Sequence, residues 1–223
     1  MGGMGEERDP DMYSYVPRAT VRPARKVCTA FLTSVRGRLR AEGINAQISS
    51  VGSAKHNMVT RDGDQPFDLD YDVLISSPGI GQGALKETVL AAVRKAAPAY
   101  GFRKVQDSTS AITCIHRRDG TDAIDFHLDI GIIVMRDEDT GCRLIHDKDR
   151  NTYFLNEPVH FRDLEERVAV IKRYNKKNEL RKIYLEKKNG YLKKGDRDHP
   201  SFVVYVEAVD QVYQKITGKG GIE

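Results

Sequence analysis

The chain has 223 residues, enough for one substantial core or for a core with a smaller helical part. Charged residues make up 30% of it, the net charge is only +4, and no apolar stretch approaches the roughly 18 residues of a membrane-spanning helix. No charged-then-apolar leader opens it, and its three cysteines lack zinc or disulfide spacing, so we expect a cytoplasmic protein without a membrane partner.

The first part of the chain is predicted to form an arm, a helix and a strand. Residues 1–18 are rich in Gly, Asp, Glu and Pro without periodicity, which indicates a flexible N-terminal arm. A helix is expected from Pro23 to Ala41, where apolar residues recur every four positions. A strand over residues 44–51 then ends at Gly52-Ser53, a turn whose backbone N–H groups could cradle phosphates.

Three aspartates alternate with apolar residues in the next predicted strand, residues 67–75. Side chains at i, i+2 and i+4 of a strand share one face, so Asp68, Asp70 and Asp72 are expected to point the same way. Such like charges repel unless solvent, a base or a divalent cation compensates them. Because the strand runs on into an apolar segment that suits a core, we predict a metal site at the edge of a buried strand.

The middle of the chain supplies another carboxylate. After a Gly-rich loop, a helix is predicted over residues 84–97 from its apolar stripe. Residues 110–118 and 121–134 then flank Asp119-Gly120, which predicts a β-hairpin. Its second arm carries Asp125, a third carboxylate on a neighbouring strand. His127 and Asp129 share the face of Asp125 and are minor candidates.

The C-terminal part is predicted to be helical, over residues 162–188 and 201–216. The β-branched run that starts at Phe202 suits a strand by propensity, but its apolar spacing favours a helix. Between Lys172 and Arg197 eleven Lys or Arg residues stand against three acidic ones, interleaved with tyrosines. This run could contact phosphates and stack on bases, or it could be a solvated helix face.

Taken together, these motifs resemble the nucleotidyltransferases with a polymerase-β-like fold. The Gly-Ser turn, the Asp-x-Asp pair before an apolar strand and the later lone Asp are that superfamily's signature. Three more segments are similar to the branch of the oligoadenylate synthetases, cyclic-GMP-AMP synthase and the bacterial CD-NTases. They are residues 124–130, residues 144–158, and residues 169–174 with 199–207. The likeness covers roughly residues 20 to 215.

The resemblance implies a mixed α/β (α+β) fold. A nucleotidyltransferase core over residues 19–158, with a central mixed or antiparallel sheet flanked by helices, would precede a small C-terminal helical subdomain over residues 159–223. It also implies that Asp70, Asp72 and Asp125 hold two Mg²⁺ or Mn²⁺ ions and are catalytic. Since Asp72 directly precedes the apolar run, the register of residues 70 and 72 fits best, and Asp68 with Asp70 is the alternative.

The nucleotide contacts also follow from the resemblance. Gly52 and Ser53 would contact the triphosphate, Lys172 and Ser201 would hold its outer phosphates, and Phe202 would stack on the donor base. For these residues the ordinary structural roles are also open: a surface lysine, a serine at a helix start and a core phenylalanine. Lys55 and His56 follow the turn, and solvent exposure is their default.

The expected function is transfer of a nucleotide from a nucleoside triphosphate to a hydroxyl acceptor with pyrophosphate release. The product could be a cyclic or linear oligonucleotide signal, and the acceptor a nucleotide or RNA. An enzyme that extends RNA ends or modifies a small molecule is the alternative reaction. A non-catalytic module that binds nucleic acid or a partner protein is the alternative of another class. The oligomeric state is open.

Overall fold

The computed structural model describes most of the chain. The described residues are 12–76, 78–117, 120, 124–137, 140–157, 163–196 and 199–218, with Ile124 described for its backbone alone. The chain forms two compact units. We call Val16–Val59 with Pro66–Val159 the sheet unit, and Met1–Tyr15 with Thr60–Gln65 and His160–Glu223 the helical unit. Within the described ranges, each helix is too short or too polar to cross a membrane.

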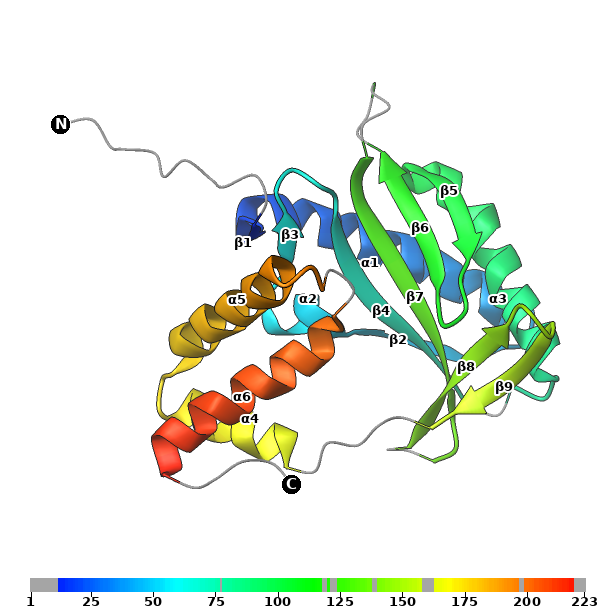
Figure 1. The fold of residues 1–223 in the computed structure, drawn as a ribbon. Helices are drawn as coiled ribbons and strands as arrows, with labels where there is room; N and C mark the ends of the chain where they lie inside the picture. Colours follow the sequence, from blue (N-terminus) through cyan, green and yellow to red (C-terminus); the bar gives the residue numbers. More distant parts are fainter. Residues whose placement is uncertain are drawn as a thin grey trace. The chain divides into compact units, whose positions relative to one another are not determined.

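In its described residues, the sheet unit is a seven-stranded mixed sheet with helices packed on one face (Figure 1). Its helical elements are α1 (Arg18–Ala41), α2 (Gly52–His56), α3 (Gln82–Ala96) and the short 3-10 helix η1 (Ala97–Tyr100). Its strands are β2 (Ala46–Ser50), β4 (Phe67–Ser76), β5 (Phe102–Asp107), β6 (Ile112–Arg117), β7 (Ile124–Met135), β8 (Gly141–Asp147) and β9 (Thr152–Asn156). The helices α1 and α3 contact each other and lie behind the sheet in the view of Figure 1.

Strands β4 and β7 are the central pair of the sheet. β4 runs parallel to β7 and, on its other side, antiparallel to β2. β7 is long enough to pair antiparallel with β6 along its first half and with β8 near its end. The predicted mixed sheet and the two antiparallel arms of the predicted hairpin are therefore confirmed, while Asp119 of its turn lies outside the described residues.

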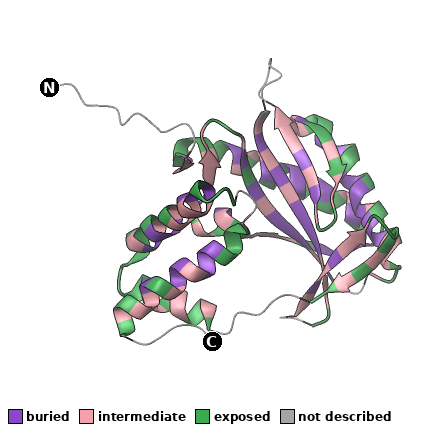
Figure 2. Cartoon of the chain, viewed as in Figure 1, coloured by how far each residue is buried: buried purple, intermediate pink, exposed green. Residues whose placement is uncertain are grey.

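The two faces of this central pair differ in polarity. Every second residue of β4, from Phe67 to Ile75, is buried, and so are Phe126, Leu128 and Ile130 of β7. Both rows belong to one core with the apolar residues of α1 and α3. Because side chains alternate along a strand, the intervening residues lie on the face turned away from these helices. Figure 2 shows the alternation of buried and less buried residues along the strands.

Helix α1 begins earlier than its sequence pattern predicts. The predicted start was Pro23, but the helix begins at Arg18 and contains Pro23. A proline lacks the N–H that would bond to the carbonyl four residues earlier, so the helix loses one hydrogen bond close to its start. The predicted stripe otherwise holds, because Phe31, Val35 and Leu39 are fully buried.

The helical unit contains three helices and a two-stranded sheet among its described residues. The elements are β1 (Tyr13–Tyr15), β3 (Thr60–Asp62), α4 (Leu164–Arg173), α5 (Lys177–Lys193) and α6 (Ser201–Thr217). The side-chain amide of Asn189 on α5 exchanges hydrogen bonds of 2.7 and 3.1 Å with the backbone of Tyr13 on β1. Of the predicted N-terminal arm, residues 1–11 lie outside the described residues.

One predicted helix is two. The sequence pattern favoured a single helix over residues 162–188, whereas the structure ends α4 at Arg173 and starts α5 at Lys177. Asn175 has a φ of +54°, and the N–H of Lys176 donates to the carbonyl of Ile171. This is the helix-ending motif that an asparagine in the left-handed region supports. The helical interpretation of the Phe202 run is confirmed by α6.

The central strand allows a matched test of the core. Leu69 is fully buried, whereas Leu74 lies on the opposite face and is partly exposed. We expect Leu69→Ala to lower the free energy of unfolding by about 2–5 kcal/mol, because it leaves a cavity under α1 and α3. Leu74→Ala should cost clearly less. Urea denaturation of both variants measures this, and equal losses would contradict the assignment of the two faces.

Candidate active site

Four aspartates line the face of β4 and β7 that is turned away from α1 and α3. The parallel register places Asp70 opposite Asp129, with Asp68 opposite His127 one step before them and Asp72 opposite Gly131 one step beyond. Adjacent strands lie about 4.8 Å apart, so Asp70 and Asp129 are direct neighbours. The side chain of Asp68 is 62% exposed and accepts a 3.1 Å hydrogen bond from His127 Nδ1, whereas Asp72 is buried.

The structure does not bring Asp125 to this group. Asp125 precedes Asp129 by four residues on the same strand, which separates their backbones by about 13 Å. Its Oδ2 lies 3.5 Å from Nδ1 of His116 on β6. Strand alternation predicts one face for both aspartates, and only the register of β7 against β4 shows which of them lies beside Asp70. Asp129, and not Asp125, is therefore the β7 aspartate that lies beside Asp70.

The Gly-Ser pair lies against the same carboxylates. Gly52 and Ser53 open the short helix α2, which contacts β4. A β-carbon at Gly52 would lie 2.5 Å from Oδ2 of Asp70, and the φ of this glycine is +59°. A side chain at this position would thus both collide with the carboxylate and strain the backbone. The absence of one lets the Gly52 backbone lie directly against the Asp70 carboxylate.

Burial and mutual repulsion set the charge state of these carboxylates. Burial first, and then the charges of Asp129, Asp68 and Asp72, raise the pKa of Asp70 to about 6. Burial also raises the pKa of Asp129, although a 2.6 Å hydrogen bond from the Thr113 hydroxyl opposes this. A group of carboxylates that resists ionisation is one that a nearby cation would stabilise.

Asp72 already has a cationic partner, the guanidinium of Arg143. The Nη2 of Arg143, from β8, donates to Oδ1 of Asp72 at 3.1 Å. Burial raises the pKa of Asp72, and the Arg143 guanidinium opposes that rise. No sequence motif points to Arg143, because β8 pairs with β7 at a position that the motifs do not mark. A glycine inside a strand, Gly131, was the available signal for a close approach of this kind.

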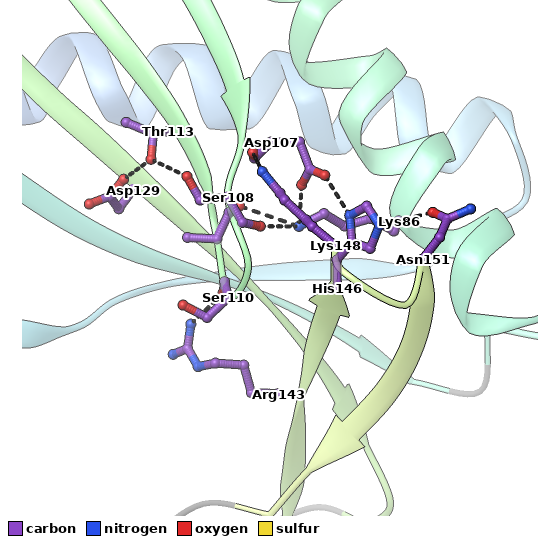
Figure 3. Close-up of polar contacts among 11 residues, drawn as sticks. Lys86, Asp107, Ser108, Ser110, Thr113, Asp129, Arg143, His146, Lys148 and Asn151 are labelled. Atoms are coloured by element: carbon purple, nitrogen blue, oxygen red, sulfur yellow. Dashed lines mark hydrogen bonds and ion pairs between the residues drawn. The ribbon is translucent and has the colours of Figure 1, made fainter.

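A polar network supports the site from the β5–β6 turn (Figure 3). The hydroxyl of Thr113 lies between Asp129 and Ser108, whose Oγ is 3.3 Å from it. Lys86, a fully buried lysine of α3, ion-pairs with Asp107 at 2.9 Å and donates to the carbonyls of Ser108 and Ala111. The turn that holds Thr113 is therefore tied to α3 by a buried charge.

His146 completes this network on the other side of Asp107. Its Nδ1 lies 2.7 Å from Oδ2 of Asp107, and its ring stacks on Tyr153 with 4.3 Å between the ring centroids. Although burial alone would raise the pKa of Asp107, hydrogen bonds from Lys86 and His146 lower it. Asp107 is thus held ionised between two partners, which fixes the start of the β5–β6 turn.

The carboxylates of this site suit a hard divalent cation, although their side chains do not converge on one point. Carboxylate oxygens are what Mg²⁺ and Mn²⁺ prefer, and Asp70 and Asp129 present theirs on adjacent strands. Among the described residues, however, no three His, Cys, Asp or Glu side chains converge closely enough to hold a metal. Asp72 faces Arg143 instead. The carboxylates therefore need side-chain movement to share an ion.

The remaining predicted nucleotide contacts lie in the helical unit. Lys172 is exposed near the end of α4, and Ser201 is the first residue of α6. Phe202 follows it and is 49% exposed, unlike a core phenylalanine. Gly52, Ser53 and the aspartates belong to the sheet unit. Lys55 is exposed, as expected, while His56 is partly buried.

No protein-family model and no curated protein matches the sequence. Solved structures of bacterial CD-NTases do match the fold. CdnC of E. coli MS115-1, solved with ATP, is 16% identical over 91% of this chain and 62% of its own, with a TM-score of 0.59. CdnE of Elizabethkingia meningoseptica, a cyclic dinucleotide synthase solved with GTP and Apcpp, is 15% identical over 89% of this chain and 72% of its own, with a TM-score of 0.56. DncV of Vibrio cholerae, solved with 3'-deoxy ATP, is 16% identical over 92% of this chain and 54% of its own, with a TM-score of 0.54.

These likenesses confirm the predicted fold: a mixed sheet flanked by helices, arranged as in the CD-NTases. The chain spans 62% of the CdnC chain and 54% of the DncV chain. At sequence identities of 15 and 16%, these matches support a shared fold and nothing beyond it.

The raised pKa of Asp70 predicts how stability depends on pH in the absence of divalent ions. Between about pH 4 and 6 the folded state keeps a proton that the unfolded state has lost, so the free energy of unfolding falls as pH rises through this window. Asp70→Asn removes that loss. We expect it to stabilise the protein by about 1–3 kcal/mol at pH 8 and by little at pH 4.

Urea denaturation at both pH values, with EDTA present, measures this difference. Asp68→Asn is the matched control, because Asp68 is mostly exposed and its removal should change stability less. An Asp70→Asn effect of equal size at pH 4 and pH 8 would contradict the proposed repulsion among the carboxylates.

Proposed function

We propose that the chain is a nucleotidyltransferase that uses Mg²⁺ or Mn²⁺ to move a nucleotide from a nucleoside triphosphate to a hydroxyl acceptor. The observation that supports this most is the register that places Asp70 beside Asp129, with Gly52 against the Asp70 carboxylate. Neighbouring carboxylates can hold metal ions, and these ions neutralise the phosphates of a nucleotide. The CD-NTase fold agrees with this reaction.

The candidate site residues of the sheet unit each have a role in this proposal. Asp70 and Asp129 hold the divalent ions, and Asp72 joins them, with Asp68 as the alternative on β4. Two bound ions would neutralise the triphosphate and lower the pKa of the attacking hydroxyl. Gly52 and Ser53 bind the triphosphate through backbone N–H groups and the serine hydroxyl. The hydrogen bond from Thr113 to Oδ1 orients the Asp129 carboxylate.

Asp129 is our candidate for the proton acceptor. Its carboxylate lies beside Asp70, where the proposed metal ions would hold the acceptor hydroxyl. The Thr113 hydroxyl occupies Oδ1, so Oδ2 is the oxygen that would take the proton of the acceptor hydroxyl. The acceptor oxygen then bonds to the α-phosphorus while the bond to pyrophosphate breaks.

For the helical unit the proposal rests on the sequence resemblance and on exposure. Lys172 and Ser201 are proposed to hold the outer phosphates, and Phe202 to stack on the donor base. All three are exposed at the surface of their own unit, as such contacts require. The proposed reaction uses a cytoplasmic pool of nucleoside triphosphate and Mg²⁺, so we propose a cytoplasmic enzyme.

The proposed product is a cyclic or linear oligonucleotide, in line with CdnE of Elizabethkingia meningoseptica, a cyclic dinucleotide synthase. An RNA end is the second candidate acceptor. It is favoured by the basic run on α4 and α5 and by Tyr174, a tyrosine within that run whose exposure is 59%. Aromatic rings among basic side chains bind single-stranded nucleic acid by stacking and charge.

Pyrophosphate release tests the proposed catalytic set. With each nucleoside triphosphate and Mg²⁺ or Mn²⁺, the wild-type protein should release pyrophosphate, and Asp70→Asn or Asp129→Asn should lower the rate about 100-fold or more. Asp125→Asn is the matched control on the same strand and should keep most of the activity. Mass analysis of the products would identify them as cyclic, linear or RNA-linked.

The outcomes separate the alternatives. If Asp125→Asn abolished release and Asp129→Asn did not, the third carboxylate would be the one first expected from the sequence. If the wild-type protein released no pyrophosphate under any of these conditions, the non-catalytic binding module would be favoured.

A further inference from the structure

Arg143 crosses the position of Gly131 to reach the candidate metal ligand Asp72. A β-carbon at Gly131 would collide with both the Arg143 guanidinium and the Asp72 carboxylate. The absence of a side chain on β7 therefore makes room for an ion pair between β4 and β8, the strands on either side. Such a built passage indicates a specific contact, unlike a chance pairing of surface charges.

The guanidinium is held at two points. Nη2 donates to Asp72 at 3.1 Å. Nη1 donates to the carbonyl of Ser110 at 3.3 Å (Figure 3). Ser110 belongs to the turn between β5 and β6, whose neighbouring carbonyls receive the buried Lys86. The Ser110 carbonyl that accepts from Nη1 is thus held in place by the β5–β6 turn, and this contact orients the Arg143 side chain toward Asp72.

The charge of Arg143 acts on two of the carboxylates, Asp72 and Asp70. It opposes the rise in the pKa of Asp72 and also lowers that of Asp70. A divalent cation would have the same effect on the same groups. Arg143 and a metal ion are therefore alternative counter-ions for Asp72.

Exposure shows which partner can leave. The Asp72 side chain is 12% exposed, whereas the Arg143 side chain is 35% exposed. The carboxylate stays in the sheet, while the long arginine side chain can turn toward solvent without crossing the core. Leaving Asp72 buried without a cation would be costly, so the exchange requires an incoming positive charge.

We propose that Arg143 is an internal counter-ion that occupies Asp72 until a divalent cation displaces it. This inference rests on the proposed metal site. It explains why the carboxylates do not converge on one ion while Arg143 is in place. The free energy of metal binding then includes the cost of breaking the Arg143–Asp72 pair. Removing the guanidinium should therefore strengthen metal binding.

Mn²⁺ binding tests the proposal without activity. Free Mn²⁺ is titrated with the full-length chain by electron paramagnetic resonance, without nucleotide, for the wild type, Arg143→Gln, Arg143→Lys and Asp72→Asn. Arg143→Gln should lower the Kd about 3- to 10-fold, the size expected for a partly exposed ion pair. Arg143→Lys keeps the charge and should stay close to the wild type. Asp72→Asn should weaken binding.

Thermal unfolding gives a second readout for the same four proteins. In EDTA, Arg143→Gln should melt below the wild type, because it leaves the Asp72 carboxylate buried without its partner. Mn²⁺ should then raise its Tm more than it raises that of the wild type. This comparison also shows whether each variant is folded.

The proposal and the metal site fail in different ways. If Asp72→Asn weakened Mn²⁺ binding while Arg143→Gln bound with wild-type or lower affinity, Arg143 would orient Asp72 without competing with metal, and the counter-ion proposal would be overturned. If the wild type bound no Mn²⁺, or if Asp72→Asn bound as well as the wild type, the proposed metal site itself would lack support at Asp72.

Discussion

The parallel pairing of β4 with β7 is the constraint on which the candidate site depends. It places Asp70 against Asp129 on one face and the apolar rows of both strands against α1 and α3 on the other. A one-residue slip would turn the aspartates into the core, so burial of the apolar rows fixes the face that the carboxylates share. The same contact that stabilises the sheet therefore assembles the site.

The arrangement costs stability, and neighbouring groups reduce that cost. Asp70 is raised in pKa by burial and by three other carboxylates. Thr113 donates to Asp129 and Arg143 to Asp72, while Asp68 pairs with His127 toward solvent. The buried Lys86 ion-pairs with Asp107 and donates to the carbonyls of Ser108 and Ala111, which fixes the β5–β6 turn beside these contacts. Sites that bind cations commonly carry such unfavourable charge in their free form.

The sequence was enough to predict features that depend on local pattern. Alternation in residues 67–75 predicted β4 and its common aspartate face, and apolar spacing after Pro200 predicted α6 in spite of its β-branched run. Features that depend on pairing between distant segments were not predictable in this way. Strand alternation predicts one face for Asp125 and Asp129, so choosing between them required the register with β4. Arg143 depended on where β8 joins β7, and the break at Asn175 depended on a single residue's left-handed backbone.

A crystal structure with Mn²⁺ and a non-hydrolysable nucleoside triphosphate would test the central claim most directly, because anomalous scattering locates the metal independently of the protein model. We predict an anomalous peak within coordination distance of the carboxylates of both Asp70 and Asp129, with the phosphates beside Gly52. A peak bound by Asp125, or a bound triphosphate with no metal at Asp70, would contradict the account.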